Sequence, residues 1–420
     1  MTLPNNISAN STKKVAFAAL HDRDFRFFFF TTMLAMMADN IEHVISYWLL
    51  FQKFHSPVLA GFADISHWTP FLLFSVYFGG IADRYDCRKV IQVAQVMYMG
   101  VSAAWAVLFY TDTIQVWHAS VLLIIHGLAG VLWTPAEQLF IHDIVGSERI
   151  QSAVRLNATS RQLGILFGPA VGAGLMLLLG PSLGLLANSL IYLPLTVWLL
   201  VVPYTGHLRE GPPPKRAIGW KDAISVIREV AHNRAIITMV LLGGSASLFV
   251  GNSFHTQMPE FAHDLGAQAD FAYGALLTAS AAGAVFGGFL LEGKGWLKAN
   301  VRTAITCAIL WCGAIAAFAF SNNYALSLAL LFFAGMLNLS FYSTAQAIVQ
   351  LLAPGHLRGR LIGLFTMSAF GLRAFSGVTV GFVGGWIGVH WSLAISAMAL
   401  LAVTLALFAF AIPSRQDELG

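Results

Sequence analysis

The sequence predicts an all-α integral membrane protein with twelve transmembrane helices and both termini in the cytoplasm. Of its 420 residues, 57% are hydrophobic and only 10% are charged, whereas a typical soluble domain is about 25% charged. Apolar runs of about 20 residues, each long enough to cross a hydrocarbon core of ~30 Å, follow one another along the chain. Lysine and arginine gather in alternate connections between these runs. This composition excludes a soluble enzyme, a disordered chain and a nucleic-acid-binding protein.

The predicted spans form two sets of six. The first set covers 27–52, 57–81, 90–110, 115–138, 153–179 and 182–203, and the second covers 235–259, 271–292, 299–320, 324–350, 360–386 and 388–412. Only a helix satisfies its own backbone groups in lipid over such a length. The chain therefore divides into a cytoplasmic N-terminus (1–26), a six-helix half (27–203), a cytoplasmic linker (204–234), a second six-helix half (235–412) and a cytoplasmic tail (413–420).

The basic residues predict the orientation. Of the 24 lysines and arginines, all but Lys53, Arg161 and Arg373 lie at the termini or in the connections of one side. The positive-inside rule makes that side the cytoplasm and puts both termini there. We expect the membrane to be a bacterial inner membrane.

Other chemistry has no signature in the sequence. The three cysteines, Cys87, Cys307 and Cys312, have no metal-binding spacing, and no His–Cys cluster indicates zinc. There is no phosphate-binding Gly-Lys-Ser/Thr loop and no plausible Ser-His-Asp arrangement. We therefore expect no enzymatic activity, no cofactor and no bound metal.

The connection after the second span has the composition of a latch. It reads from Gly79 through Asp83 and Arg84 to Arg88 and Lys89. Glycine lets helices approach closely, and Asp83 can cap a neighbouring helix or pair with an arginine. This pattern resembles the signature loop of the major facilitator superfamily, which implies two rocking halves and a latch that holds the outward-facing state. A faint repeat, Gly288 and Glu292 at the end of the eighth span, supports an internal duplication.

The fifth span resembles the motif that is typical of exporters in that superfamily. Its core consists of Gly164, Gly168, Pro169 and Gly172, which predicts a bendable and tightly packed helix. The first glycine of the motif is replaced by Arg155. Further segments spread over most of the chain resemble the branch of enterobactin exporters and macrolide efflux proteins.

Three ionisable residues share one face of the first span. Asp39, Glu42 and His43 lie at positions i, i+3 and i+4, and Asp39 is about 18 Å into the helix, near the membrane midplane. Ionisable side chains at this depth are functional candidates. We interpret all three as proton-coupling residues. A permanently paired structural acid is the alternative for Asp39. For Glu42 the alternatives are a ligand for a cationic substrate and a residue that faces the cavity without a dedicated role, and for His43 the alternative is a hydrogen-bonded packing histidine.

Two arginines also lie within predicted spans. Arg373 is near mid-depth in the eleventh span, where it is a candidate to bind an anionic substrate group or to pair with Asp39 or Glu42. A structural pairing is the alternative. Arg161, in the fifth span, has Glu137 of the fourth span as its candidate partner in a buried charge pair.

Aromatic and amide side chains suggest a cavity that suits an amphipathic organic molecule. Together with Arg373, the candidate substrate-binding residues are Trp48, Trp133, Asn252, His255, Asn338, Tyr342 and Gln346. Packing against lipid or neighbouring helices is the alternative for the aromatic residues.

These observations predict a monomeric secondary transporter that exports a small amphipathic molecule, a drug-like compound or a siderophore, in exchange for protons. Its partners are the substrate, protons and membrane lipid. A proton-coupled importer of a metabolite or siderophore remains an alternative, as do a channel and a non-transporting receptor or scaffold with a transporter fold.

Overall fold

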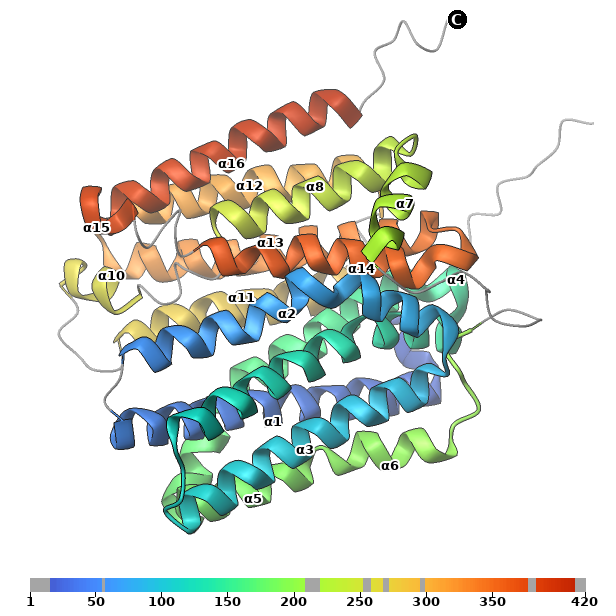
Figure 1. The fold of residues 1–420 in the computed structure, drawn as a ribbon. Helices are drawn as coiled ribbons and strands as arrows, with labels where there is room; N and C mark the ends of the chain where they lie inside the picture. Colours follow the sequence, from blue (N-terminus) through green and yellow to red (C-terminus); the bar gives the residue numbers. More distant parts are fainter. Residues whose placement is uncertain are drawn as a thin grey trace, which may run out of the picture.

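The structure, a computed structural model, describes residues 16–54, 57–207, 220–251, 258–266, 272–294, 299–376 and 383–411. The described residues form α-helices and short 3-10 turns (Figure 1). Asn252 and His255 lie outside the described residues.

The helices fall into two groups along the chain. The first group, α1–α6, contains α1 (Arg23–Phe54), α2 (Pro57–Arg84), α3 (Cys87–Tyr110), α4 (Val116–Leu179), α5 (Pro181–Ile191) and α6 (Leu193–Val201). The second group, α8–α16, contains α8 (Arg234–Phe249), α10 (Met258–Asp264), α11 (Ala272–Lys294), α12 (Val301–Ala319), α13 (Tyr324–Leu352), α14 (Arg358–Ala369), α15 (Val383–Ile387) and α16 (Val389–Ala411). The amphipathic helix α7 (Trp220–Val230) lies between the groups in sequence.

Six of the described helical segments are long and apolar enough to cross a membrane by length and composition. They are α3, α4, Pro181–Val201, α12, α13 and α16. Two shorter apolar helices, Arg234–Phe249 and Gly274–Leu290, resemble them in composition. The helical class that the sequence predicts is therefore confirmed.

Helix α4 covers two predicted spans. Gly146 has a φ of 69° and a ψ of 174°, which interrupts the helix between 116–145 and 147–179. A positive φ costs glycine little, so this position allows the chain to turn back without strain. We call these parts the first and second segments of α4.

The eleventh predicted span is also interrupted. Helix α14 ends at Ala369, and a 3-10 turn follows over Gly371–Phe375. A Cβ atom on Gly371 would lie 2.5 Å from the Cα atom of Leu72 in α2, so this break brings two backbones together. Arg373 consequently lies in an irregular turn, whereas the sequence pattern predicts a continuous helix.

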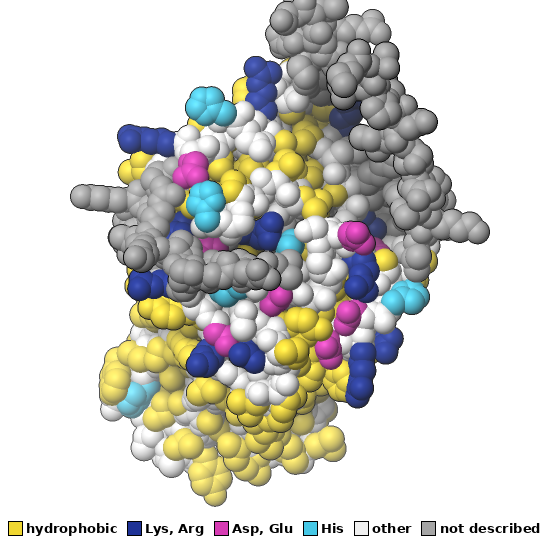
Figure 2. Space-filling model, turned by 90° about the vertical axis from the view of Figure 1, so that its right-hand side faces the viewer, with side chains coloured by type: hydrophobic (Ala, Val, Ile, Leu, Met, Phe, Trp, Pro, Cys, Tyr) yellow, Lys and Arg dark blue, Asp and Glu magenta, His cyan; other side chains and the backbone are white. Residues whose placement is uncertain are grey.

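The two groups have separate hydrophobic cores and meet along the middle of the molecule. One core consists almost entirely of α8–α16 side chains, and two others consist mainly of side chains from α1–α6. Helices α2 and α4 of the first group lie against α14 and α11 of the second (Figure 1). Charged side chains gather on the end of the bundle where α2 ends and α14 begins (Figure 2). We call this end the latch end.

Candidate functional site

The centre of the first group holds two carboxylates bridged by a histidine. His126, from the first segment of α4, has its Nδ1 atom 2.9 Å from Glu42 Oε1 and its Nε2 atom 2.9 Å from Asp39 Oδ1. Glu42 and His126 are 2% and 3% exposed, and Asp39 is 7% exposed. A protonated imidazole between two carboxylates offsets part of the cost of burying their charge.

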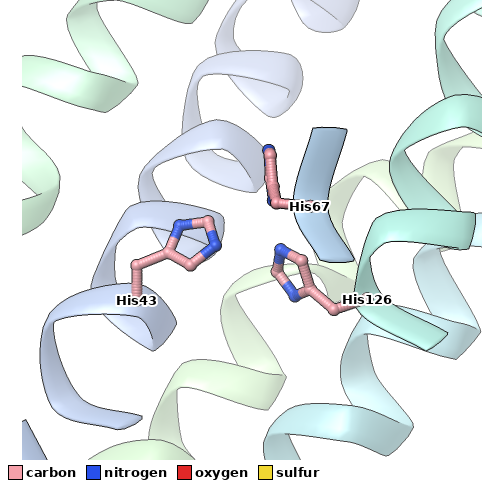
Figure 3. Close-up of side chains that lie close together, drawn as sticks. All are labelled: His43, His67 and His126. Carbon is pink, nitrogen blue, oxygen red and sulfur yellow. The ribbon is translucent and has the colours of Figure 1, made fainter. Parts of the chain in front are cut away.

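Two more histidines lie beside Asp39, Glu42 and His126. His43 Nδ1 lies 3.8 Å from Asp39 Oδ2, and the ring centroids of His43 and His126 are 4.7 Å apart. His67, from α2, has its ring centroid 5.1 Å from that of His43. Figure 3 shows the three rings gathered in the space between α1, α2 and α4. The five residues Asp39, Glu42, His43, His67 and His126 are called the carboxylate–histidine cluster below.

Close packing fixes the helix that carries the carboxylates. Cβ atoms on Gly164 and Gly168 would crowd Met36 and Asn40 of α1, so these glycines allow the second segment of α4 to lie directly on α1. On another side, Asn188 of α5 donates hydrogen bonds to Ala38 O at 2.9 Å and to Ser102 Oγ at 3.1 Å. The turn that carries Asp39 is therefore held by α4 and α5.

A second ion pair, between a buried glutamate and a partly exposed arginine, lies in the same helix group. Arg161 Nη1 is 3.1 Å from Glu137 Oε2, which is the pairing that the sequence suggests between the fourth and fifth spans. The Arg161 guanidinium also lies 5.1 Å from the centre of the Trp133 ring. Tyr98 contacts both Trp133 and His126 edge-on. Aromatic side chains thus link the carboxylate–histidine cluster to the Arg161–Glu137 pair.

An aromatic group joins the two helix groups beside His67. Trp68 of α2 stacks on Phe370 with ring centroids 6.4 Å apart, and Phe370 stacks on Tyr342 of α13 at the same distance. The Arg373 guanidinium lies 4.9 Å from the Trp68 centroid and 4.8 Å from the Phe370 centroid. Among the described residues, neither Asp39 nor Glu42 pairs with Arg373, because His126 takes that place.

The other predicted cavity residues are placed differently. Asn338, Tyr342 and Gln346 are all partly buried on α13. Trp133 is buried, at 1% exposed, whereas Trp48 is 51% exposed on the surface of α1. The structure therefore places Trp133 near the carboxylate–histidine cluster and Trp48 on the surface, away from it.

At the latch end, Asp83 caps α14. Its carboxylate accepts hydrogen bonds from the backbone N–H groups of Gly359 at 2.6 Å and Arg360 at 3.0 Å. A carboxylate at a helix N-terminus is favourable because unpaired N–H groups and the helix dipole both attract it. A Cβ atom on Gly79 would overlap the carbonyl oxygen of Gly359, so glycine is needed for this approach.

The basic residues after Asp83 make contacts within the first helix group. Arg88 pairs with Asp86 at 2.7 Å and donates a hydrogen bond to Val202 O at 2.6 Å. The Arg84 guanidinium lies 5.7 Å from the Tyr85 ring centre, and Lys89 is exposed on α3. The Arg88 hydrogen bond holds the beginning of α3 near the end of α6.

A related contact joins the two helix groups through α4 and α11. Arg155 of α4 pairs with Glu292 of α11 at 3.0 Å, and both side chains are about 5% exposed or less. Ser152 Oγ also donates a hydrogen bond to Glu292. A Cβ atom on Gly288 would overlap Thr159 Oγ1. The repeated Gly and acidic residues that the sequence suggests therefore both lie at contacts between the two helix groups.

Sequence reasoning missed His126, His67 as a member of the cluster, and Phe370. His126 lies 84 positions from Glu42, so no local spacing connects them. A histidine inside an apolar run is the one signal that was available, because polar residues at that depth require a partner.

The fold is that of a major facilitator superfamily transporter. The crystal structure of the human organic anion transporter MFSD10 matches it with a TM-score of 0.75 and 14% identity over 91% of this chain and 99% of that chain. The fucose:proton symporter FucP of E. coli matches with a TM-score of 0.69 and 14% identity over 93% and 98% of the two chains.

Within that superfamily, the chain belongs to the transmembrane secretion effector family, whose model matches residues 14–419. It is 24% identical over 63% of its length to the staphyloferrin A transporter of Staphylococcus aureus, and 20% identical over 50% of its length to macrolide efflux protein A of Streptococcus pyogenes. These matches span 66% and 52% of the two relatives. The chain is thus a multi-pass plasma membrane protein that belongs to a family of transporters.

Proposed function

We propose that this protein exports a small amphipathic organic molecule in exchange for protons, by alternating access between two six-helix halves. The carboxylate–histidine cluster is the observation that carries this proposal. Two acids and a bridging histidine are buried in α1 and α4. Ionisable groups inside spanning helices are costly to bury, which makes them candidates for a function.

In this proposal the protein crosses the membrane twelve times and has both termini in the cytoplasm. Here the first and second halves correspond to the groups α1–α6 and α8–α16. The charges at the latch end support its cytoplasmic placement (Figure 2). On this placement, the Asp83 cap and the Arg155–Glu292 pair close the cytoplasmic side, and breaking both would accompany the change to the inward-facing state.

Proton coupling is assigned to Asp39 and Glu42, with His43 and His126 as the groups that share their protons. His126 contacts both acids at 2.9 Å, so a proton that arrives on either acid changes the electrostatic interaction of His126 with the other. The cluster lies on α1, which packs on α4 and α5. A change in the charge of the cluster would therefore alter the helix packing of the first half.

The substrate site is assigned to the aromatic group that borders His67. Trp68, Phe370, Tyr342 and Arg373 combine flat apolar surfaces with one cationic group, which suits a molecule with apolar and anionic parts. The names of the relatives, a staphyloferrin A transporter and a macrolide efflux protein, make siderophores and macrolides the first compounds to test.

The test is transport in proteoliposomes with an imposed pH gradient. Carboxylate siderophores and macrolides are supplied singly, and movement is followed in both directions. We expect wild-type protein to accumulate at least one of them against its gradient, on the acidic side. Asp39→Asn should abolish this accumulation and retain passive exchange.

Asp112→Asn is the matched control, because Asp112 is 87% exposed at the side chain and pairs with Lys53 at the exposed end of α1, 14 positions along the chain from Asp39. It should leave transport unchanged. Wild-type accumulation by Asp39→Asn would remove Asp39 as the coupling residue. Accumulation on the alkaline side, or transport driven by a sodium gradient alone, would contradict proton-coupled export.

A further inference from the structure

Three histidines from three different helices converge at the carboxylate–histidine cluster. His43 comes from α1, His67 from α2 and His126 from the first segment of α4, and Figure 3 shows their rings gathered in one space. One ring nitrogen from each lies within 4.8 Å of the other two. Imidazole nitrogens grouped in this way are typical ligands of zinc, copper, iron and nickel ions.

The spacing is close to what a transition metal requires. Three atoms no more than 4.8 Å apart all lie within about 2.8 Å of a common point, whereas a zinc–nitrogen bond is ~2.0–2.1 Å long. Each nitrogen would move by less than ~1 Å, which small side-chain rotations supply. No change in helix packing is needed to form the three bonds.

Asp39 completes the ligand set, and the two carboxylates together supply the negative charge that a cation needs. Asp39 Oδ1 and His126 Nε2 lie 2.9 Å apart, yet both are buried atoms without a hydrogen-bond partner of suitable angle. His67 Nδ1 is likewise buried without such a partner. A divalent cation between them would use these atoms as ligands and would balance the charge of two carboxylates.

The contact of the second ring nitrogen of His126 also fits a metal site. His126 Nδ1 is 2.9 Å from Glu42 Oε1. In metal sites, a ligating histidine almost always uses its second nitrogen to donate a hydrogen bond to a carboxylate or carbonyl group, which fixes the ring. Glu42 is placed to orient His126 in this way, with Nε2 directed toward Asp39 and the other histidines.

We propose that His43, His67 and His126, with Asp39, bind a first-row divalent transition metal ion in the centre of the first helix group, and that Glu42 orients His126. This site goes beyond the proposed export function, which does not require a metal. A bound ion would occupy atoms of Asp39, His43 and His126 that take part in proton coupling, so coupling is a property of the metal-free cluster and the ion would inhibit it. The sequence gives no zinc-binding spacing because each histidine comes from a different helix.

The test uses full-length protein in detergent, freed of metal with a chelator and of any polyhistidine tag by proteolysis. Co²⁺ is the probe, because its visible absorption distinguishes four- or five-coordinate nitrogen ligation from the hydrated ion. Wild-type protein should bind about one Co²⁺ per chain with such a spectrum, and Zn²⁺ should displace it. Glu42→Gln should weaken Co²⁺ binding ~10–100-fold.

His43→Ala and His67→Ala are the main variants, because both leave the His126 bridge between the two acids intact. Each should lose the Co²⁺ spectrum while still eluting as a single species in size-exclusion chromatography. His263→Ala is the control, since His263 is 88% exposed at the side chain and should bind Co²⁺ as the wild type does. A wild-type protein without the spectrum, or a spectrum that survives both main variants, would overturn the proposal.

The two proposals fail separately. Transport in the presence of a chelator tests export without the metal, and Co²⁺ binding in detergent tests the metal site without transport. Loss of one result leaves the other unchanged.

Discussion

His126 is the residue whose removal should cost the most stability in the first helix group. It contacts Asp39 and Glu42 at 2.9 Å each and is 3% exposed. His126→Ala would leave two buried acids without their shared partner, and breaking a buried ion pair in this way costs about 3–5 kcal/mol. We expect a clearly lower midpoint of thermal unfolding in detergent, measured by intrinsic fluorescence.

His118→Ala provides the comparison on the same helix. His118 is only partly buried and bonds to the backbone N–H of Gln115 at the beginning of α4. Losing that capping contact should cost about 1 kcal/mol. Equal midpoints for the two variants would show that His126 does not stabilise the buried acids.

At the residue scale, the sequence predicts the acids but not their partners. Asp39, Glu42 and His43 lie on one face of one helix, and helical periodicity is local information. His126 is brought to them only by the packing of α4 on α1, which glycines such as Gly164 permit. Depth in the membrane alone makes Arg373 a candidate partner for Asp39 or Glu42. Only the fold shows that its guanidinium packs on the rings of Trp68 and Phe370.

At the element scale, small residues decide which helices touch, and two kinds of contact can be separated. Gly79 lies where α2 meets α14 of the other group, whereas Gly335 of α13 packs against Ser280 of α11 within one group. An alanine Cβ would overlap a backbone carbonyl oxygen at either position. Overpacking of this kind costs about 1–3 kcal/mol.

The two substitutions should have different consequences. Gly79→Ala should shift the protein away from the state with a closed latch end, because it opposes only contact between the groups. Gly335→Ala should lower the unfolding midpoint without that shift. The measurement is the labelling rate of single cysteines placed at the latch end, compared with the unfolding midpoint of each variant.

Gly100→Ala is the control for both, since nothing lies within 4 Å of a Cβ atom at Gly100 in α3. It should be neutral or slightly stabilising, because alanine restricts the unfolded chain. Similar labelling rates for Gly79→Ala and Gly100→Ala would argue against a close contact at Gly79.

Helix positions follow from the sequence better than helix interruptions do. Apolar runs predict α3, α12, α13 and α16 to within a few residues, because burial in lipid requires a minimum length. The break between Ala369 and Arg373 depends on the approach of Gly371 to Leu72. That contact joins residues almost 300 positions apart, so no local pattern reveals it.

At the scale of the whole molecule, two acidic contacts hold the helix groups together at positions that correspond in the proposed duplication. Asp83 of α2 caps α14, and Glu292 of α11 pairs with Arg155 of α4. They involve different helices and share no residue. Free energies of independent contacts add, so the two should contribute separately to one opening equilibrium.

The final prediction concerns the combined effect of these two contacts on the opening equilibrium. Asp83→Asn removes the negative charge at the α14 N-terminus, which is worth up to ~2 kcal/mol in a partly buried setting. Glu292→Gln weakens a charge-assisted hydrogen bond worth about 1.5–3 kcal/mol. Each variant should raise the open population roughly tenfold or more, and the double variant should raise it by the product of the two factors. Distances between spin labels on α2 and α14, and on α4 and α11, measure these populations. If the double variant is no more open than the stronger single variant, the two contacts do not act on one equilibrium. Separate local openings would then replace the rocking of two rigid halves as the mechanism.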